Sequence, residues 1–90
     1  MTIHQLTCIK DPSSVEDFGF TWTTWLNGDT IATSAWSVPS GITQNSASNT
    51  TTATTIWLSS GTVGQDYEIY NTIVTAGGRT ERALLKILVR

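Results

Sequence analysis

Residues 67–90 read YEIYNTIVTAGGRTERALLKILVR, and this stretch decides the fold. From Tyr67 to Thr75 the side chains alternate, which predicts an extended strand. The glycines at 77 and 78 accept the positive φ that tight hairpin turns need. From Thr80 to Arg90 the alternation resumes, with one wholly apolar face that consists of Ala83, Leu85, Ile87 and Val89. The stretch therefore predicts a β-hairpin of two long strands.

Upstream of the hairpin, the same pattern repeats in shorter segments. We expect strands at 17–22, 30–38, 42–46 and 50–58, separated by turns rich in Pro, Gly, Asn, Asp and Ser. Thr23 to Leu26 is predicted to form a short turn or a single helical turn. A change of spacing along 30–38 predicts a bulge near Ser34 or Ala35. Six or seven short strands at this spacing indicate an all-β fold, an immunoglobulin-like antiparallel β-sandwich.

The N-terminal segment 1–9 differs from the rest because its alternation is weak and Lys10-Asp11-Pro12 separates it from the next strand. We expect an extended arm or strand over 1–9 and the sandwich domain over 10–90. Because extended segments add readily to exposed sheet edges, the arm is expected to pack on a neighbouring chain.

The core of the sandwich is expected to draw on aromatic and aliphatic residues from several strands. Four Trp in a chain of 90 residues is a high share, and each can bury roughly 150–250 Å². The expected core residues are Trp36, Trp57, Ile56, Ile31, Tyr67, Ile69, Leu85 and Ile87. The four Trp could alternatively form a platform for stacking sugars, although core packing is the better interpretation for Trp36 and Trp57.

Composition argues against several classes of partner. Charged residues are 13% of the chain, about half of the usual share of roughly 25%, and the net charge is −2. Because no basic stripe is present, we expect no nucleic-acid binding. No run approaches the roughly 18 apolar residues of a membrane span, and no signal peptide is visible. With Cys8 as the one cysteine, no intramolecular disulfide can form, which indicates a reducing compartment.

Catalytic and metal-binding patterns are missing from the sequence. His4 is the one histidine, Cys8 has only Lys10 nearby to lower its pKa, and the acidic residues are scattered among turns. The segment from Gly77 to Thr80 is a hairpin and not a phosphate loop, because no helix follows it. We therefore expect no enzyme activity, no cofactor and no metal.

The outward face of the last strand carries the best candidate for an interface. Leu84 and Leu88 lie there between Arg82, Lys86 and Arg90, although a solvated face should be polar. Apolar residues at the centre with cations at the rim are typical of an interface. Together with apolar residues of the N-terminal segment, the candidate interface residues are Ile3, Leu6, Arg82, Leu84, Lys86 and Leu88.

The chain from Lys10 to Arg90 resembles a family of small tailed-bacteriophage proteins described as fibre-tail adaptor or neck-associated virion proteins. The resemblance rests on the order and spacing of its motifs, which are KDP (10–12), Trp22, WL (25–26), GDTI (28–31), WSVPSG (36–41), WLSSGT (57–62), Tyr67 and NTIVTAGGRT (71–80). Residues 83–88, ALLKIL, are more apolar than this resemblance leads us to expect.

The resemblance implies a structural subunit of a phage virion, made in the host cytoplasm and present in several copies on a connector, tail or capsid vertex. Its implied partners are other virion proteins, and it implies no catalytic residues. The alternative is an immunoglobulin-like module that binds carbohydrate or another surface, which exposed aromatic residues would serve.

Overall fold

The computed structural model describes residues 4–90, and strands dominate it. Its elements, in chain order, are β1 (His4–Lys10), β2 (Glu16–Thr21), α1 (Thr23–Leu26), β3 (Ile31–Ser37), β4 (Ile42–Asn49), β5 (Ala53–Ser60), β6 (Asp66–Thr75) and β7 (Thr80–Val89). The predicted all-β class is confirmed, as is the single helical turn after β2.

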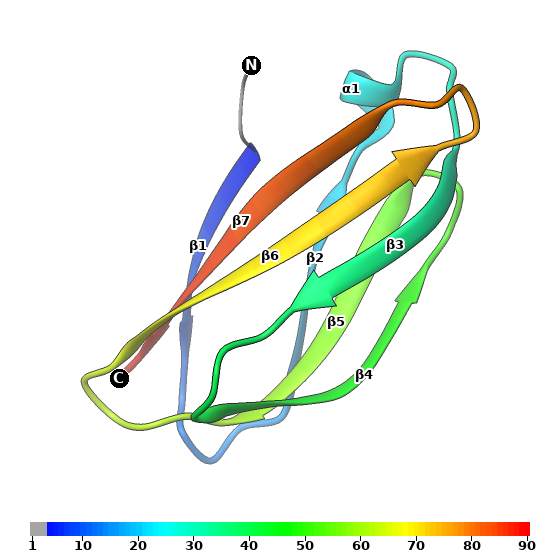
Figure 1. Ribbon diagram of the computed structural model, residues 1–90. Coiled ribbons are helices and arrows are strands. Elements are labelled where there is room, and N and C mark those ends of the chain that lie inside the picture. The colour runs from blue at the N-terminus through cyan, green and yellow to red at the C-terminus, as the bar shows by residue number, and fades with distance from the viewer. Residues whose placement is uncertain (1–3) are drawn as a thin grey trace.

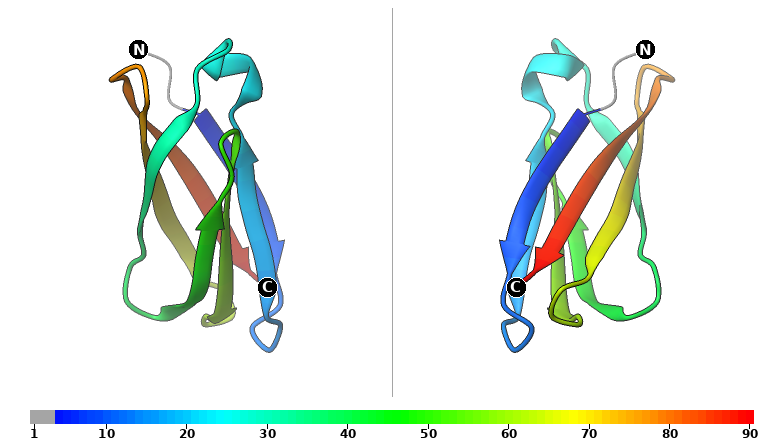
Figure 2. Two further views of the ribbon diagram at one scale, coloured as in Figure 1. Left: turned by 90° about the vertical axis from the view of Figure 1, so that its right-hand side faces the viewer. Right: turned by 90° about the vertical axis from the view of Figure 1, so that its left-hand side faces the viewer.

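The strands form two sheets that pack as layers (Figures 1 and 2). Sheet A has the order β1-β7-β6-β3, and sheet B has the order β2-β5-β4. All pairs are antiparallel except β1 with β7, which is parallel. The orders β2-β5-β4 and β7-β6-β3 correspond to the B-E-D and G-F-C orders of immunoglobulin domains, which supports the immunoglobulin-like interpretation.

The predicted hairpin is the longest pairing in the molecule. β6 and β7 are in register from Asp66 opposite Leu88 to Val74 opposite Thr80. Gly78 has a φ of +90°, and the Thr75 amide donates to the Arg79 carbonyl at 2.8 Å to close the turn. The turn of this hairpin lies at the same end of the sandwich as α1 (Figure 2).

The N-terminal segment departs from its expected packing. β1 pairs with β7 of its own chain along its whole length, from His4 opposite Ala83 to Lys10 opposite Val89. Lys10 is fully buried, and its Nζ donates to the Ser60 carbonyl of sheet B at 2.8 Å. The described part of the segment is therefore an edge strand tied to both sheets, and the expectation that it packs on a neighbour and not on its own sandwich is wrong.

The tryptophan assignments need a second correction. Trp57 is 41% exposed, because β5 alternates and its buried neighbours Ile56 and Leu58 take the inner face. Trp36 is half-buried against the core, and the fully buried indole is that of Trp22. The other expected core residues are buried, namely Ile31, Ile56, Tyr67, Ile69, Leu85 and Ile87.

The bulge in β3 lies earlier than predicted. The β3–β6 register shifts between Ile31 and Thr33, so Ala32 is the extra residue and not Ser34 or Ala35. Thr33 consequently faces outward, while Ser34 and Trp36 face the core opposite Ile73 and Asn71. β4 has a second shift between Gln44 and Ser46.

Candidate interaction surface

The alternation of β7 defines one face of the candidate site. Ala83, Leu85, Ile87 and Val89 are each 0% exposed on the inner face. Arg82, Leu84, Lys86 and Leu88 therefore point away from the core, with both leucines half-buried by their neighbours. The structure thus places four of the predicted interface residues together on the outer face of sheet A.

Side chains from the flanking strands extend this outer face. Ile9 of β1 is the register partner of Leu88 and is 68% exposed. Tyr70 of β6 is the register partner of Leu84, and the Arg82 guanidinium stacks over its ring, 4.4 Å from the centroid. The result is an apolar strip, defined by Ile9, Leu88, Leu84 and Tyr70, which Lys86 interrupts between the two leucines.

A shallow hollow of about 510 Å³ opens on the same face. Asp66, Glu68, Tyr70 and Lys86 of the β6–β7 pair line it, together with Tyr67 and with Pro39 and Ser40 of the loop before β4. Asp66 is held by Arg90 at 3.1 Å, and Glu68 is the register partner of Lys86. Each carboxylate therefore has a cation beside it within the chain.

The structure does not place the other two predicted interface residues on this face. Leu6 is 38% exposed on β1, but it is the register partner of Leu85 and so belongs to the inner side of the edge strand. Ile3 falls outside the residues that the structure describes. Ile9 also lies on this face, although the sequence interpretation did not include it; the parallel register of β1 with β7 places it there.

The outer face of sheet B carries an exposed tryptophan among small polar residues. Trp57 projects from β5, the central strand of sheet B, and its register partners are Asp17 on β2 and Ser46 on β4. Nearby, Ser59 Oγ donates to Asn45 Oδ1 at 2.6 Å. The outer face of sheet B thus holds one large aromatic ring among small polar groups and a carboxylate. We call Trp57 with Asp17 the Trp57 patch.

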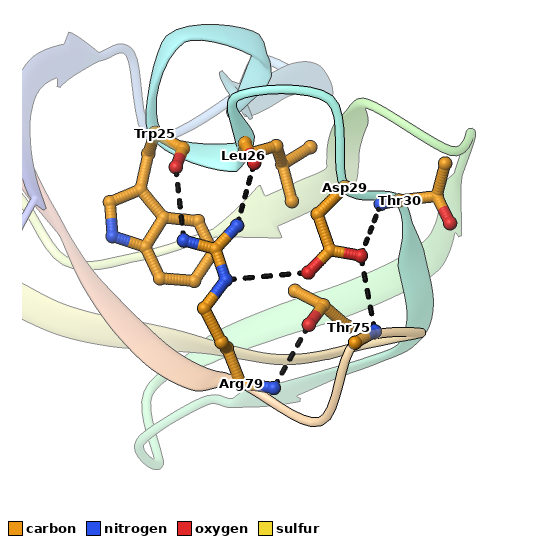
Figure 3. Close-up of polar contacts among 7 residues, drawn as sticks. Trp25, Leu26, Asp29, Thr30, Thr75 and Arg79 are labelled. Carbon is orange, nitrogen blue, oxygen red and sulfur yellow. Dashed lines mark hydrogen bonds and ion pairs between the residues drawn. The ribbon is translucent and has the colours of Figure 1, made fainter.

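The end of the sandwich that carries α1 is fixed by Arg79 (Figure 3). Its guanidinium lies 4.2 Å from the Trp25 ring centroid and donates to the Leu26 carbonyl at 2.7 Å. It also pairs with Asp29 at 3.3 Å. Since these groups belong to α1, the loop before β3 and the β6–β7 hairpin, Arg79 joins three segments distant in sequence.

Asp29 is the acceptor at the centre of this cluster. Its Oδ1 receives the amides of Thr30 at 2.8 Å and Gly77 at 3.1 Å. The hydrogen bond of the Thr75 hydroxyl, followed by the Thr30 amide, holds the pKa of Asp29 below its usual value. A Cβ at Gly77 would lie 2.8 Å from Asp29 Oδ2, so a larger residue there would displace the carboxylate from this cluster.

Reactive chemistry is sparse in residues 4–90. No group of three His, Cys, Asp or Glu in this range is placed to hold a metal ion. Burial first, and the charge of Glu16 second, raise the pKa of the Cys8 thiol, so the reactive thiolate is disfavoured. Within the same range, no helix is long and apolar enough to cross a membrane.

The chain is thus a small all-β sandwich with an apolar strip on one outer face and an exposed indole on the other. Surfaces of this composition are typical of domains that bind other proteins. Residues 10–87 match the family model described as podophage GP4 fiber-tail adaptor protein gp77, and the chain belongs to this family. It is therefore a bacteriophage structural protein of the fibre-tail adaptor class, which is not a class of enzymes. No curated protein matches the chain.

Proposed function

We propose that the protein is an adaptor subunit at the neck or connector that joins the tail to fibre components, and that the outer face of sheet A is a surface through which it contacts other protein subunits of the virion. The observation that carries this proposal is the position of Leu84 and Leu88 on the outward side of β7. A solvated outer face is normally polar, whereas this one has two leucines on either side of Lys86, with Arg82 next to Leu84.

The remaining parts of the proposal follow from composition and family. The partners are other virion proteins, and several copies act in one particle that is assembled in the host cytoplasm. Nucleic acid and membranes are not partners, because five Lys and Arg against seven Asp and Glu leave no basic surface. The immunoglobulin-like domain spans residues 10–90, and residues 4–9 of the N-terminal segment belong to its edge strand β1.

One observation favours a second candidate, an immunoglobulin-like module that binds carbohydrate. Trp57 is exposed beside Asp17 and close to Asn45, and an open indole with polar neighbours is able to stack on a sugar ring. The adaptor proposal is preferred because the family itself consists of fibre-tail adaptors.

The adaptor proposal is tested with the double substitution Leu84→Ser and Leu88→Ser in the complete phage. The fold should persist, because the inner face of β7 is unchanged, while the copy number of the chain in purified particles should fall. Val63→Ser is the matched control, since Val63 is an exposed aliphatic residue, 62% accessible, in the loop between β5 and β6 and therefore in neither sheet. Double-variant particles with the normal copy number would refute the proposed interface.

A further inference from the structure

We propose that the outer face of sheet A receives the Trp57 patch of a second copy of this chain. In this contact, Trp57 of one copy packs on the apolar strip of the next, and Asp17 faces Lys86. The inference rests on the proposed function, because it names the occupant of the same surface.

The Trp57 patch is built like one half of such a contact. An indole that is 41% exposed on the central strand of a sheet is the type of residue that anchors protein interfaces. Its neighbours on the outer face include Gly19, Thr55 and Ser59, which are small enough to let another surface approach closely.

Charge complementarity selects a copy of this chain as the occupant. The strands of sheet B contain Glu16 and Asp17 and no Lys or Arg. β7 carries Arg82 and Lys86 on its outer face. On the outer face of sheet A, these two residues and Arg90 exceed the carboxylates of Asp66 and Glu68 by one charge, whereas Asp17 gives the outer face of sheet B one negative charge. The two opposite layers of one molecule therefore carry opposite net charges.

The spacing of the groups also agrees. Directly opposed side chains such as Asp17 and Trp57 have Cβ atoms roughly 4.5–5.5 Å apart. Along β7, Lys86 lies between Leu84 and Leu88, about 7 Å from each. One patch can therefore place its indole on a leucine while its carboxylate reaches the ammonium group of Lys86.

Such a contact is heterologous, because it joins two different faces. Each copy keeps one face of each kind available, so the assembly either closes into a ring or propagates. When the outer face of sheet A in one copy packs on the outer face of sheet B in the next, the two ends of each sandwich stay uncovered. One of them is the end fixed by Arg79 and Trp25. Those ends remain open to the tail and the fibre.

The first test is sedimentation velocity on the purified full chain over a range of concentrations. The wild-type chain and Val63→Ser should self-associate, whereas Trp57→Ser alone and Leu84→Ser with Leu88→Ser should each associate at least about tenfold more weakly. An equimolar mixture of the two weakened variants should form a heterodimer and nothing larger, because one intact patch meets one intact strip. A mixture that stays monomeric while wild type associates would overturn the proposal.

Charge reversal provides a second, independent test. Asp17→Lys and Lys86→Glu should each weaken self-association, and mixing them should restore assemblies larger than a dimer, because one contact of the mixture is the wild-type pair and the other has the two charges exchanged. The stability of these assemblies should fall with added salt. A monomeric wild-type chain, or a lack of restoration, would contradict the contact between copies. If these tests fail while the leucine double variant still drops out of particles, the adaptor function stands and only the occupant is wrong.

Discussion

Thr54 Oγ1 donates a 2.7 Å hydrogen bond to Asn71 Oδ1, and the two residues belong to different sheets. Trp22 Nε1 donates to the same threonine oxygen at 3.2 Å, and Asn71 Nδ2 donates to Ser34 Oγ at 2.9 Å. Trp22, Thr54 and Asn71 are almost fully buried. This polar chain therefore links sheet B to sheet A through the apolar core, where an unmade hydrogen bond is costly.

Thr54→Val should consequently destabilise the fold although the two side chains have nearly the same shape. The change leaves Asn71 Oδ1 and Trp22 Nε1 without the hydroxyl, and we expect a loss of about 1–3 kcal/mol in the free energy of unfolding. Chemical denaturation measures this loss. Thr54→Ser is the control that keeps the hydroxyl and removes only the methyl group, so it should cost less than valine. A valine variant as stable as the wild type would show that the hydrogen bonds of the hydroxyl do not stabilise the fold.

Trp22 and Trp57 should respond differently to replacement by alanine. Trp22 is 1% exposed and packs with Leu26 and Ile73, so its loss should cost about 3–5 kcal/mol. Trp57 is 41% exposed on the outer face, so its loss should cost less than about 1 kcal/mol. Denaturant midpoints of both variants provide the comparison. Equal shifts of the two midpoints would contradict the assigned burial.

The contrast between these two tryptophans shows where the sequence alone is informative. The alternation of β6 and β7 is unbroken over long strands, so the faces of Ile69, Leu84 and Leu85 follow from the sequence. The run Ile56-Trp57-Leu58 has three consecutive apolar residues, while a strand can bury only alternate ones. Nothing in the run itself tells which residues face the core. The pairing with β2 and β4 decides it.

Some residues of the candidate site can likewise be predicted from the sequence, and others cannot. Leu84 and Leu88 are predictable from the alternation of one strand. Ile9 joins them only through the parallel pairing of β1 with β7, a contact between segments at opposite ends of the sequence. The Trp57 patch combines β2 with β5 and depends equally on a long-range register. Such registers depend on how the whole sandwich packs. The alternation of apolar and polar residues within one strand does not predict which strand it pairs with.

Asp29→Asn should alter the pH dependence of stability. Because the folded state holds the pKa of Asp29 below its usual value, the ionised carboxylate stabilises the fold above the unfolded pKa of about 3.9. That contribution is lost as the pH falls through the lower folded pKa. Wild type should therefore exceed the variant in stability at pH 7, and the two should converge in acid. A difference that stays constant from pH 7 to pH 2 would show that the charge of Asp29 has no such role.

Hydrogen exchange on the monomeric chain should find the β1 amides protected. β1 is an edge strand, but its pairing with β7 runs from His4 to Lys10, and the Arg90 amide extends it by donating to the Lys10 carbonyl at 3.1 Å. Buried Lys10 adds a tether to sheet B through the Ser60 carbonyl. Exchange in β1 should be slower than at exposed Gly28 and faster than in β6, which has strands on both sides.

Lys10→Met tests the origin of that protection, because it keeps an unbranched side chain and removes the two hydrogen bonds of Nζ, to the Asp11 and Ser60 carbonyls. We expect faster exchange in β1 and little change in β6, since the β6–β7 register does not involve Lys10. Mass spectrometry of peptides that cover residues 4–10 and 66–75 separates the two strands. If β1 in the wild-type monomer exchanges as fast as an unstructured peptide, the strand leaves its own sheet in solution. The outer edge of β7 would then be open to a strand from a neighbouring chain, as expected of an arm.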